Sequence, residues 1–515
     1  MIHDESGQSA AGENITKNAE ICVMFIQDSI RELLLDPILD ETLSLPVDDF
    51  VLNTADGSIA LGASLRMAPD GDGLQLDLRD SAGRDLRSFF ASGFRIQEKD
   101  SLNASGVLGN KLRVDFCKIW PPHISTTRPI GEVHASSAVV QLERLIIPPT
   151  GSDSQTRDQI RENLDRINPQ RPPARLEERE ADNIPRFEHI AVFRNTRLQF
   201  FNRGVEWTES HPFWGERRGS RDRTWDGEAL GGKFSLKQAG KHLEVGFRHE
   251  GGSDDEARQR FDALLHAVAY THAIFPWPTF VQRRLDWRVM EQSLRVVSQT
   301  QGRMVPLREK DGFTDPNAPT NLISSVAGLF HGIEENKNGD LLQAMWVFRG
   351  ADSRLAPQPL QMAMICSVIE GLRSGLVERK VPPVAFTDLR TEALQWISGL
   401  ESVTTCADRL GMIKRLNRVV ENWNYYDRRV EWDDAFLSLF PGRDDWVREL
   451  FKLFNKHRHG PAHGDFSAGA KIDPHASLDA LGRLAGLINL IVAAKAGYTG
   501  SILESPLSDR RIDLQ

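Results

Sequence analysis

The chain has 515 residues, of which 40% are hydrophobic and 26% charged, an ordinary composition for a globular protein of about two to four domains. Its net charge of −9 argues against a tight, non-specific binder of genomic DNA, but an enzyme that holds a few nucleotides needs only a local basic pocket. No run approaches the ~20 apolar residues that cross a bilayer, and the first residues lack a signal-peptide pattern. We therefore expect a cytoplasmic protein with no membrane partner.

The first half of the chain has the pattern of a β-rich protein. Residues 1–49 are expected to form a polar tail and a lead-in segment, and residues 50–250 a sensor or recognition region. Apolar and polar residues alternate in Leu74–Leu78 and Leu112–Phe116, and turns rich in Gly and Asp separate such runs, which is typical of short strands. A charged, proline-rich stretch near 148–185 predicts a surface linker.

An arginine cluster lies in the second part of this β-rich region. Arg217, Arg218 and Arg221 are flanked by Trp214 and Trp225. Guanidinium groups and indole rings both stack on bases, so the cluster is a candidate RNA-binding surface. Acidic residues are interspersed among the arginines, and a solvated hairpin loop is the alternative interpretation.

The second half of the chain has the period of helices. In a connecting region at 251–336, Asp254–Ile274 is amphipathic and is followed by two prolines. Residues 337–500 are expected to form an all-α bundle and residues 501–515 a C-terminal tail. The candidate helices of the bundle are Asp340–Phe348, Leu360–Leu376, Asp388–Leu400, Val403–Trp423, Trp432–Leu439, Trp446–Lys456 and Ala476–Ala494. The sequence therefore predicts a multidomain α+β protein with a β-rich N-terminal region followed by a helical bundle.

The four cysteines indicate a reducing environment. Cys22, Cys117, Cys366 and Cys406 are far apart, lie in apolar or amphipathic segments, and have no metal-ligand spacing. We expect buried thiols rather than a disulfide framework.

One short segment near the C-terminus concentrates groups that carry chemistry. Phe454–Gly464 contains three histidines, an arginine and a lysine. On one continuous helix, Arg458 and His463 would point about 140° apart. Gly460-Pro461 lies between them, and because proline cannot continue the hydrogen-bond ladder, the helix should end or kink there. The sequence thus predicts that both side chains face one site.

An arginine beside a histidine suits the cleavage of RNA without a metal ion. An imidazole titrates near neutral pH, so it can take the proton of a ribose 2′-hydroxyl or protonate the leaving 5′-oxygen. A guanidinium can hold two phosphate oxygens and stabilise the charge that builds on phosphorus. Lys456 would add positive potential. We therefore expect Arg458 and His463 to be catalytic, with no cofactor.

The segment Arg458-His459-Gly460-Pro461-Ala462-His463 fits the R-x4-H motif of HEPN domains, which are small all-α domains of prokaryotic toxins and defence proteins. The apolar run Met362–Leu372, with its embedded Glu370, resembles an early helix of the ApeA-like HEPN group, and His463-Gly464 is similar to the end of that group's motif. The apolar helix Ala476–Ala494 follows as in that group. The resemblance covers roughly residues 337–500.

This resemblance implies a metal-independent endoribonuclease that acts in anti-phage defence by abortive infection. It implies a homodimer formed through the helical domain, with the two motifs facing each other, and an N-terminal region that senses a phage-derived or nucleotide trigger. Arg458 and His463 would form the catalytic pair. His459 would support them, although the family often has Asn at this position.

Other interpretations remain open for the same residues. Basic side chains at a helix end interact favourably with exposed carbonyl groups, and a non-catalytic HEPN scaffold that binds nucleotide or a partner protein needs no reaction. His457, His459 and His463 have the spacing H-x-H-x3-H, which could supply three zinc ligands. Glu370 is expected to pair or cap within the helical domain rather than act on substrate.

Overall fold

The computed structural model describes residues 26, 30–54, 57–69, 73–82, 102–109, 112–120, 137–148, 184–196, 206–211, 215–220, 224–286, 288–296, 301–307, 317–332, 339–352, 357–374, 383–422, 437–462, 474–506 and 510–514. They belong to two compact units. Unit 1 comprises Met1–Asn195, Gly232–Ala257 and Trp277–Ser298, and unit 2 comprises Thr196–Gly231, Arg258–Pro276 and Gln299–Gln515. The chain thus passes between the units several times, and neither unit is a continuous stretch of sequence.

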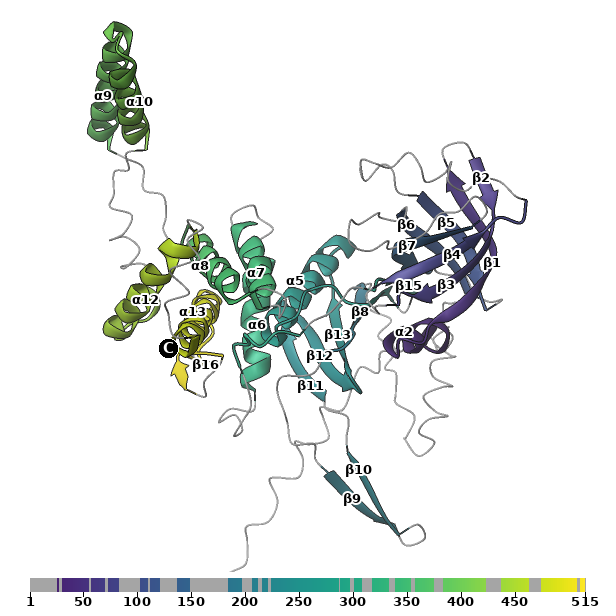
Figure 1. Ribbon diagram of the computed structural model, residues 1–515. Coiled ribbons are helices and arrows are strands. Elements are labelled where there is room, and N and C mark those ends of the chain that lie inside the picture. The colour runs from purple at the N-terminus through teal and green to yellow at the C-terminus, as the bar shows by residue number, and fades with distance from the viewer. Residues whose placement is uncertain are drawn as a thin grey trace, which may run out of the picture. The chain divides into compact units, whose positions relative to one another are not determined.

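Unit 1 contains a closed antiparallel barrel (Figure 1). Strand β1 pairs with β3, and the ring continues through β4, β7, β6 and β5 back to β1. Closure removes the exposed edges that an open sheet would leave. The strands of the ring are β1 (Ser44–Thr54), β3 (Gly62–Met67), β4 (Leu74–Arg79), β5 (Leu102–Leu108), β6 (Leu112–Trp120) and β7 (Ser137–Ile146), and β2 (Gly57–Ala60) forms a hairpin with β1.

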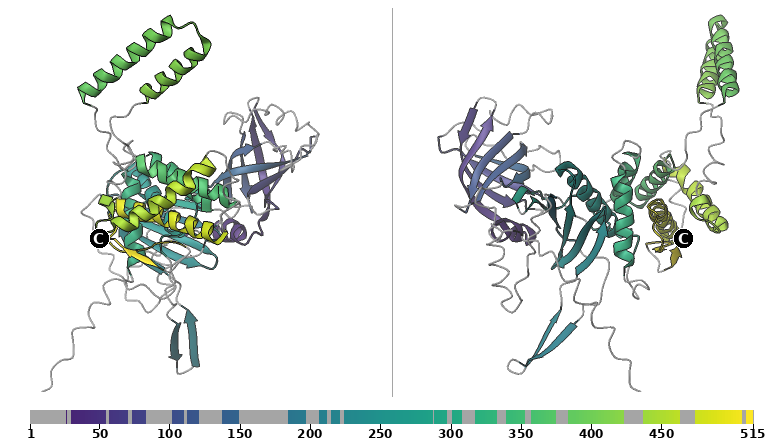
Figure 2. Two further views of the ribbon diagram at one scale, coloured as in Figure 1. Left: turned by 60° about the vertical axis from the view of Figure 1, so that its left-hand side comes forward. Right: turned by 180° about the vertical axis from the view of Figure 1, so that it is seen from behind.

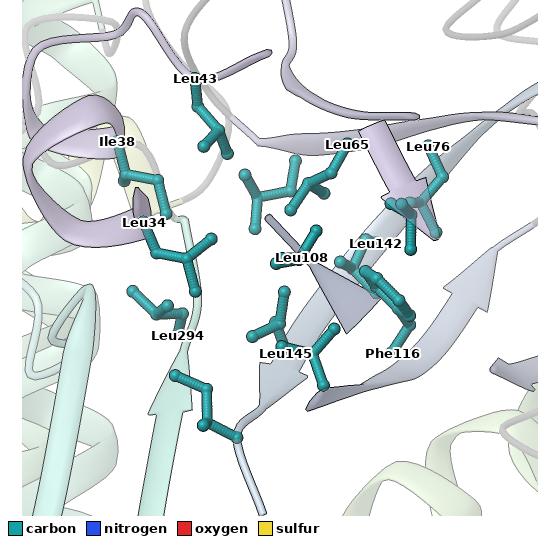
Figure 3. Close-up of a cluster of buried hydrophobic side chains, with 14 of the residues drawn as sticks. Leu34, Ile38, Leu43, Leu65, Leu76, Leu108, Phe116, Leu142, Leu145 and Leu294 are labelled. Carbon is teal, nitrogen blue, oxygen red and sulfur yellow. The ribbon is translucent and has the colours of Figure 1, made fainter. Parts of the chain in front are cut away.

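Alternating leucines fill the core of unit 1. On β4, Leu74, Leu76 and Leu78 are all buried, and Leu76 lies opposite Leu65 of β3 and Val140 of β7. A short π-helix, η1 (Arg31–Leu35), and helix α2 (Asp36–Leu39) add Leu34 and Ile38 to the same cluster. Figure 3 shows these side chains together with leucines of the strands. The alternating pattern therefore correctly predicted strands at Leu74–Leu78 and Leu112–Phe116.

An open antiparallel sheet extends from the barrel within unit 1. Strand β7 also pairs with β15 (Arg288–Leu294), and the order continues through β14 (Phe280–Leu285), β8 (Arg186–Phe193), β13 (His242–Glu250) and β12 (Gly232–Ala239). Strands β14 and β15 lie in the region 251–336 that the sequence suggested was a helical connection. In these two strands the alternation of apolar and polar residues is not visible in the sequence, because several of their polar residues are buried. Arg283 is only 6% exposed, and it is paired with Asp254 (2.5 Å) and Glu291 (3.1 Å).

Unit 2 is mainly helical (Figures 1 and 2). Helix α7 packs on α8, α8 packs on α12 and α13, and α13 also contacts α6. The predicted helices recur with shifted ends, and α6 lies in the connecting region 251–336 that was expected to be helical, although its bounds were not predicted. The bounds are α5 (Asp254–His272, which begins in unit 1), α6 (Ala318–His331), α7 (Gly339–Asp352), α8 (Gln358–Ser374), α9 (Val384–Val403), α10 (Ala407–Glu421), α12 (Asp444–Ala462) and α13 (Pro474–Lys495). Most of the candidate helix Trp432–Leu439 lies outside the described residues.

A buried polar network ties the helices of unit 2 together. The Tyr270 hydroxyl donates to Asn489 Oδ1 on α13 (3.1 Å), and Arg349 of α7 donates to the Tyr270 carbonyl (3.1 Å). Asp352 pairs with Arg349 (3.2 Å) and accepts hydrogen bonds from the backbone amides of Arg303 and Met304. Because each charge is paired, the cost of desolvating this network is offset.

The described residues of the segment 501–515 form a hairpin, where the sequence suggested a C-terminal tail. Strands β16 (Ser501–Leu503) and β17 (Arg511–Asp513) pair as a hairpin, and Ile502 and Ile512 are buried. The indole of Trp446, at the start of α12, donates to Glu504 (2.8 Å). The hairpin is therefore part of the packed helical unit.

Helix α13 is the longest apolar helix among the described residues. His475–Lys495 is long and apolar enough to cross a membrane by length and composition, and 72% of its apolar window is buried inside unit 2, as in the core helix of a folded domain. The expectation that no segment reaches this length was too strict.

Cys366 is a buried free thiol as expected, but Cys117 is partly exposed and Cys406 is exposed. Cys22 lies outside the described residues.

Candidate functional site

Two helices position the side chains of the candidate site. On α12, the apolar residues Val447, Leu450, Phe451 and Phe454 recur at helical spacing and are buried. On α8, the buried residues are Met362, Ile365, Cys366, Val368, Ile369 and Leu372. Since the apolar faces of α8 and α12 contact each other, polar residues at the border of these faces meet at the surface.

Arg458 meets Glu370 at this border. The guanidinium Nε of Arg458 on α12 is paired with carboxylate Oε1 of Glu370 on α8. The two side chains are 37% and 39% exposed, although the Glu370 Oε1 atom that faces Arg458 is itself buried. Glu370 therefore pairs inside the helical domain, and its partner is the arginine of the R-x4-H segment.

The guanidinium of Arg458 also packs against an aromatic ring. The guanidinium carbon of Arg458 lies 5.9 Å from the ring centroid of Phe454, one turn earlier on α12, a distance at which cation–π attraction acts. Phe454 is itself buried and meets Phe451 edge to face. The arginine is thus held between a rigid aromatic ring and a carboxylate.

Cys366 lies one helical turn before Glu370 on α8 and is 3% exposed. Burial raises the pKa of its thiol to about 12; the Glu370 carboxylate adds to the rise and Arg458 opposes it. A thiol with this pKa is protonated at neutral pH and is therefore a poor nucleophile or metal ligand. Its role beside the ion pair is to fill space.

The other predicted residues of the segment have different environments. His457 is 6% exposed, and burial, together with the neighbouring charge of Lys456, lowers its pKa. Lys456 is exposed on α12. The backbone of His459 lies in α12, and its side chain is outside the described part. His463 also lies outside the described residues, so the predicted meeting of Arg458 and His463 stays a prediction.

Helix α12 ends close to the point where the sequence predicted an end or a kink. It includes Gly460 and Pro461 and ends at Ala462, one residue after the proline. Proline has no amide hydrogen, so Pro461 cannot donate to the carbonyl of His457 four residues earlier, and the hydrogen-bond ladder of α12 loses a bond in its last turns.

The arginine cluster lies on a hairpin in unit 2. Strands β9 (Glu206–His211) and β10 (Gly215–Ser220) pair in antiparallel register, with Arg217 opposite Glu209 and Arg218 opposite Thr208. Arg221 lies outside the described residues. The cluster belongs to a different element from Arg458, and the choice between an RNA-binding surface and a solvated loop stays a prediction.

Two features escaped the sequence analysis. The pairing of Glu370 with Arg458 joins residues from distant helices, and only helix packing brings them together. Unit 2 also has a polar cavity of about 460 Å³, lined by Asn321 and Ser325 of α6, Tyr498 and Arg511 among others. Its residues come from scattered segments without a motif.

Within the described ranges, no group of three or more His, Cys, Asp or Glu side chains is arranged to hold a metal ion. Comparison with protein-family models finds no match to this chain, and comparisons with curated proteins and with solved structures find none either.

Proposed function

We propose that the chain is a metal-independent endoribonuclease of the HEPN type, which acts in anti-phage defence by cleaving RNA. It works in the cytoplasm as a homodimer formed through the helical domain. The β-rich region senses the trigger, which is phage-derived or a nucleotide. The proposal rests on the resemblance of the C-terminal segment to the ApeA-like HEPN group and on the environment of Arg458.

The observation that carries the proposal is the partly exposed Arg458 side chain, held at the border of two packed helices and close to His463 in the sequence. The guanidinium lies over the Phe454 ring and against Glu370, so it keeps a defined direction. Such a group can bind a phosphate oxygen with little loss of entropy. The phosphate must then displace Glu370, the carboxylate partner of Arg458.

The reaction that fits these residues is an internal transfer of the phosphodiester. The 2′-oxygen forms a bond to phosphorus while the bond from phosphorus to the 5′-oxygen breaks. A base, assigned to His463, takes the 2′ proton, and a proton is delivered to the leaving 5′-oxygen. Arg458 neutralises the charge on the non-bridging oxygens. The products carry a 2′,3′-cyclic phosphate and a 5′-hydroxyl.

The test is cleavage of total RNA by the purified full-length protein in EDTA. His463→Ala should abolish cleavage, and Arg458→Ala should reduce the rate by on the order of 10²–10³ because it removes a preorganised phosphate clamp. Matched controls are Arg448→Ala, an exposed arginine of α12, and His475→Ala, an exposed histidine of α13. Both should keep wild-type activity. Cleavage that survives His463→Ala, or that proceeds on a 2′-deoxy substrate, excludes this mechanism.

The second candidate function is a non-catalytic HEPN scaffold that binds a nucleotide or a partner protein. The ion pair of Arg458 with Glu370 favours it, because an arginine that already has a carboxylate partner can serve packing alone. The same assay decides between the two functions. A scaffold gives no discrete RNA fragments with the wild-type protein in the presence of its trigger.

A further inference from the structure

Unit 2 contains a cavity of about 460 Å³ that the proposed reaction does not use. Its walls come from four separate segments: β11 (Thr224–Ala229), α6, the loop from α13 into β16, and β17. Helix α6 contacts β11 and α13, and α13 contacts β16, so these segments meet within one unit. Sites for small organic ligands measure roughly 300–1,000 Å³. The cavity therefore has the size of a site for a small molecule rather than for a single ion.

Polar side chains dominate the lining of the cavity. Asn321 and Ser325 lie on α6, and Thr499 and Ser501 follow the end of α13. Most ligand pockets are instead lined by apolar and aromatic side chains with a few polar groups. An apolar ligand would displace water from these hydroxyl and amide groups and leave them without hydrogen bonds, which costs free energy. The lining therefore favours a hydrophilic ligand.

The loop that follows α13 is a fixed wall of the cavity. Gly497 has a φ of +69°, a left-handed conformation that glycine adopts without strain. The amide of Gly497 donates to the carbonyl of Ala494 (3.0 Å), and the amide of Tyr498 donates to the carbonyl of Ala493 (3.0 Å). This is the Schellman pattern of a helix end. Because the backbone of the loop is held by these bonds, the cavity is largely formed before a ligand binds.

Two features favour a negatively charged group inside the cavity. Arg511 of β17 is the one arginine or lysine among the described residues that line it. A guanidinium has five N–H donors, so it can hold a carboxylate in addition to other contacts. Ala318 and Asn321 come from the N-terminal end of α6, where the backbone amides lack helical partners and carry partial positive charge. Both the side chain and the helix end therefore attract an anion.

Glu228 of β11 supplies the opposite charge. It is the one aspartate or glutamate among the described residues of the lining. The hydroxyl of Ser324 on α6 donates to the backbone carbonyl of Glu228, which fixes this end of β11 against the helix. An ionised carboxylate accepts strong hydrogen bonds from an ammonium group. Together with Arg511, the lining thus carries one formal positive and one formal negative charge.

Charge balance decides between the classes of hydrophilic ligand. A phosphate monoester carries about −1.5 to −2 charges at pH 7, and it would bring this excess into a cavity that already contains the carboxylate of Glu228. A zwitterion with one carboxylate and one ammonium group gives a partner to each charged side chain and leaves no excess. Free amino acids are the most compact biological molecules of this kind, and the polar lining suits a polar side chain.

We propose that the cavity is a binding site for a free amino acid with a polar side chain. Arg511 and the N-terminal end of α6 bind its carboxylate, and Glu228 binds its ammonium group. Asn321 and Ser325 bind its side chain. Binding is non-covalent, so no bond forms or breaks. The inference rests on the cavity and its charges and does not depend on RNA cleavage.

The first experiment is isothermal titration calorimetry of the full-length protein with L-serine, L-threonine, L-asparagine and L-glutamine. At least one of them should bind. The tightest probe is then compared with two analogues, one without the ammonium group and one without the carboxylate. For serine these are 3-hydroxypropanoate and ethanolamine, and for glutamine they are glutaramate and 4-aminobutanamide. Each analogue should bind at least about 10-fold more weakly, because it leaves one charged side chain without its partner.

The second experiment assigns the two charges to the ligand. Arg511→Gln and Glu228→Gln should each raise the dissociation constant of the amino acid at least about 10-fold. The matched controls are Arg510→Gln, at the neighbouring arginine, which is outside the lining, and Glu392→Gln, at an exposed glutamate of α9. Both controls should bind as the wild type does. Thermal unfolding confirms that each variant is folded.

A third pair of variants tests the place of binding without changing a charge. Ser325→Phe puts an aromatic ring into the cavity and should abolish binding. The matched control is Gly328→Phe, one turn further along α6, where nothing lies within 4 Å of an added Cβ atom. It should bind the amino acid normally. Circular dichroism confirms that both variants keep their helices.

Several results would overturn the proposal. It is wrong if none of the four amino acids binds at millimolar concentration, or if an analogue with only one of the two charges binds equally well. Undiminished binding in Ser325→Phe means that the ligand occupies another site. If inorganic phosphate or ribose 5-phosphate binds more tightly than every amino acid, the cavity is a phosphate site and the proposal fails. A protein that binds no amino acid but cleaves RNA would leave the proposed function standing without this site.

Discussion

Arg458 on α12 and Glu370 on α8 form an ion pair across the packed helices, and each side chain is more than one third exposed. The pair places the arginine of the R-x4-H segment at an open border of the helical unit. It also gives that arginine a carboxylate partner that an incoming phosphate would have to displace. This competition makes the pair the most direct point at which to test the candidate site.

Glu370→Gln should strengthen RNA binding, because it frees the Arg458 guanidinium while keeping the shape of the side chain. Exposed ion pairs contribute only about 0–1 kcal/mol, so the free energy of unfolding should change by no more than that. Binding of a labelled 2′-deoxy oligonucleotide analogue, followed by fluorescence anisotropy, measures the effect. Glu449→Gln, which removes another exposed carboxylate partner from an arginine, is the control and should not alter binding. Weaker binding by Glu370→Gln would instead assign Glu370 the task of orienting Arg458.

The stability of unit 2 should fall as the pH drops from about 6.5 to about 4. His272 is fully buried, and burial lowers its pKa from 6.5 to about 4, although its hydrogen bond to the Val268 carbonyl (2.9 Å) opposes the shift. In this window the unfolded chain takes up a proton that the native His272 does not, so acid favours unfolding, by on the order of 3 kcal/mol at the lower end. Urea unfolding of wild type and His272→Asn at several pH values measures the difference. An equal pH dependence in both proteins would contradict the prediction.

Gly486→Ala should destabilise the helical unit. A Cβ atom at this position of α13 would lie 1.8 Å from the carbonyl oxygen of Glu504, a backbone atom that cannot rotate away. Overpacking of this kind costs about 1–3 kcal/mol or more. Gly411→Ala on α10 is the control, since nothing lies within 4 Å of its added Cβ, and it should stabilise its helix by up to about 1 kcal/mol. Thermal unfolding of the two variants should shift in opposite directions.

The cysteines should differ in reactivity towards a maleimide at pH 8. Cys406 is exposed and should be labelled quickly, whereas Cys366 is buried with a pKa near 12 and should react only after unfolding. Peptide mass spectrometry after timed labelling distinguishes the two. Rapid labelling of Cys366 in the native protein would mean that α8 and α12 separate readily, and with them the Arg458–Glu370 pair.

Local patterns in the sequence identified many of the elements. Alternation of apolar and polar residues located β4 and β6, and helical spacing located α5, α7, α8, α9, α10, α12 and α13 to within six residues at each end. These patterns are reliable because the period of apolar residues follows directly from the geometry of a strand or a helix. The pattern failed at β14 and β15, where buried charged residues such as Arg283 interrupt it, and at α6, which follows an irregular segment.

The sequence by itself determined the α+β class, with a β-rich region before most of the helices, and it singled out the Arg458–His463 segment as the densest group of chemically active side chains. Only the tertiary structure decided that the chain passes repeatedly between two units, that the strands from β1 to β7, apart from β2, close into a barrel, and that Glu370 meets Arg458. The same holds for Leu389, Trp396 and Met412 of α9 and α10, which are apolar and yet exposed. The physical reason is that periodicity records which side of an element is apolar, whereas the neighbour that covers that side is chosen by packing between segments far apart in the chain.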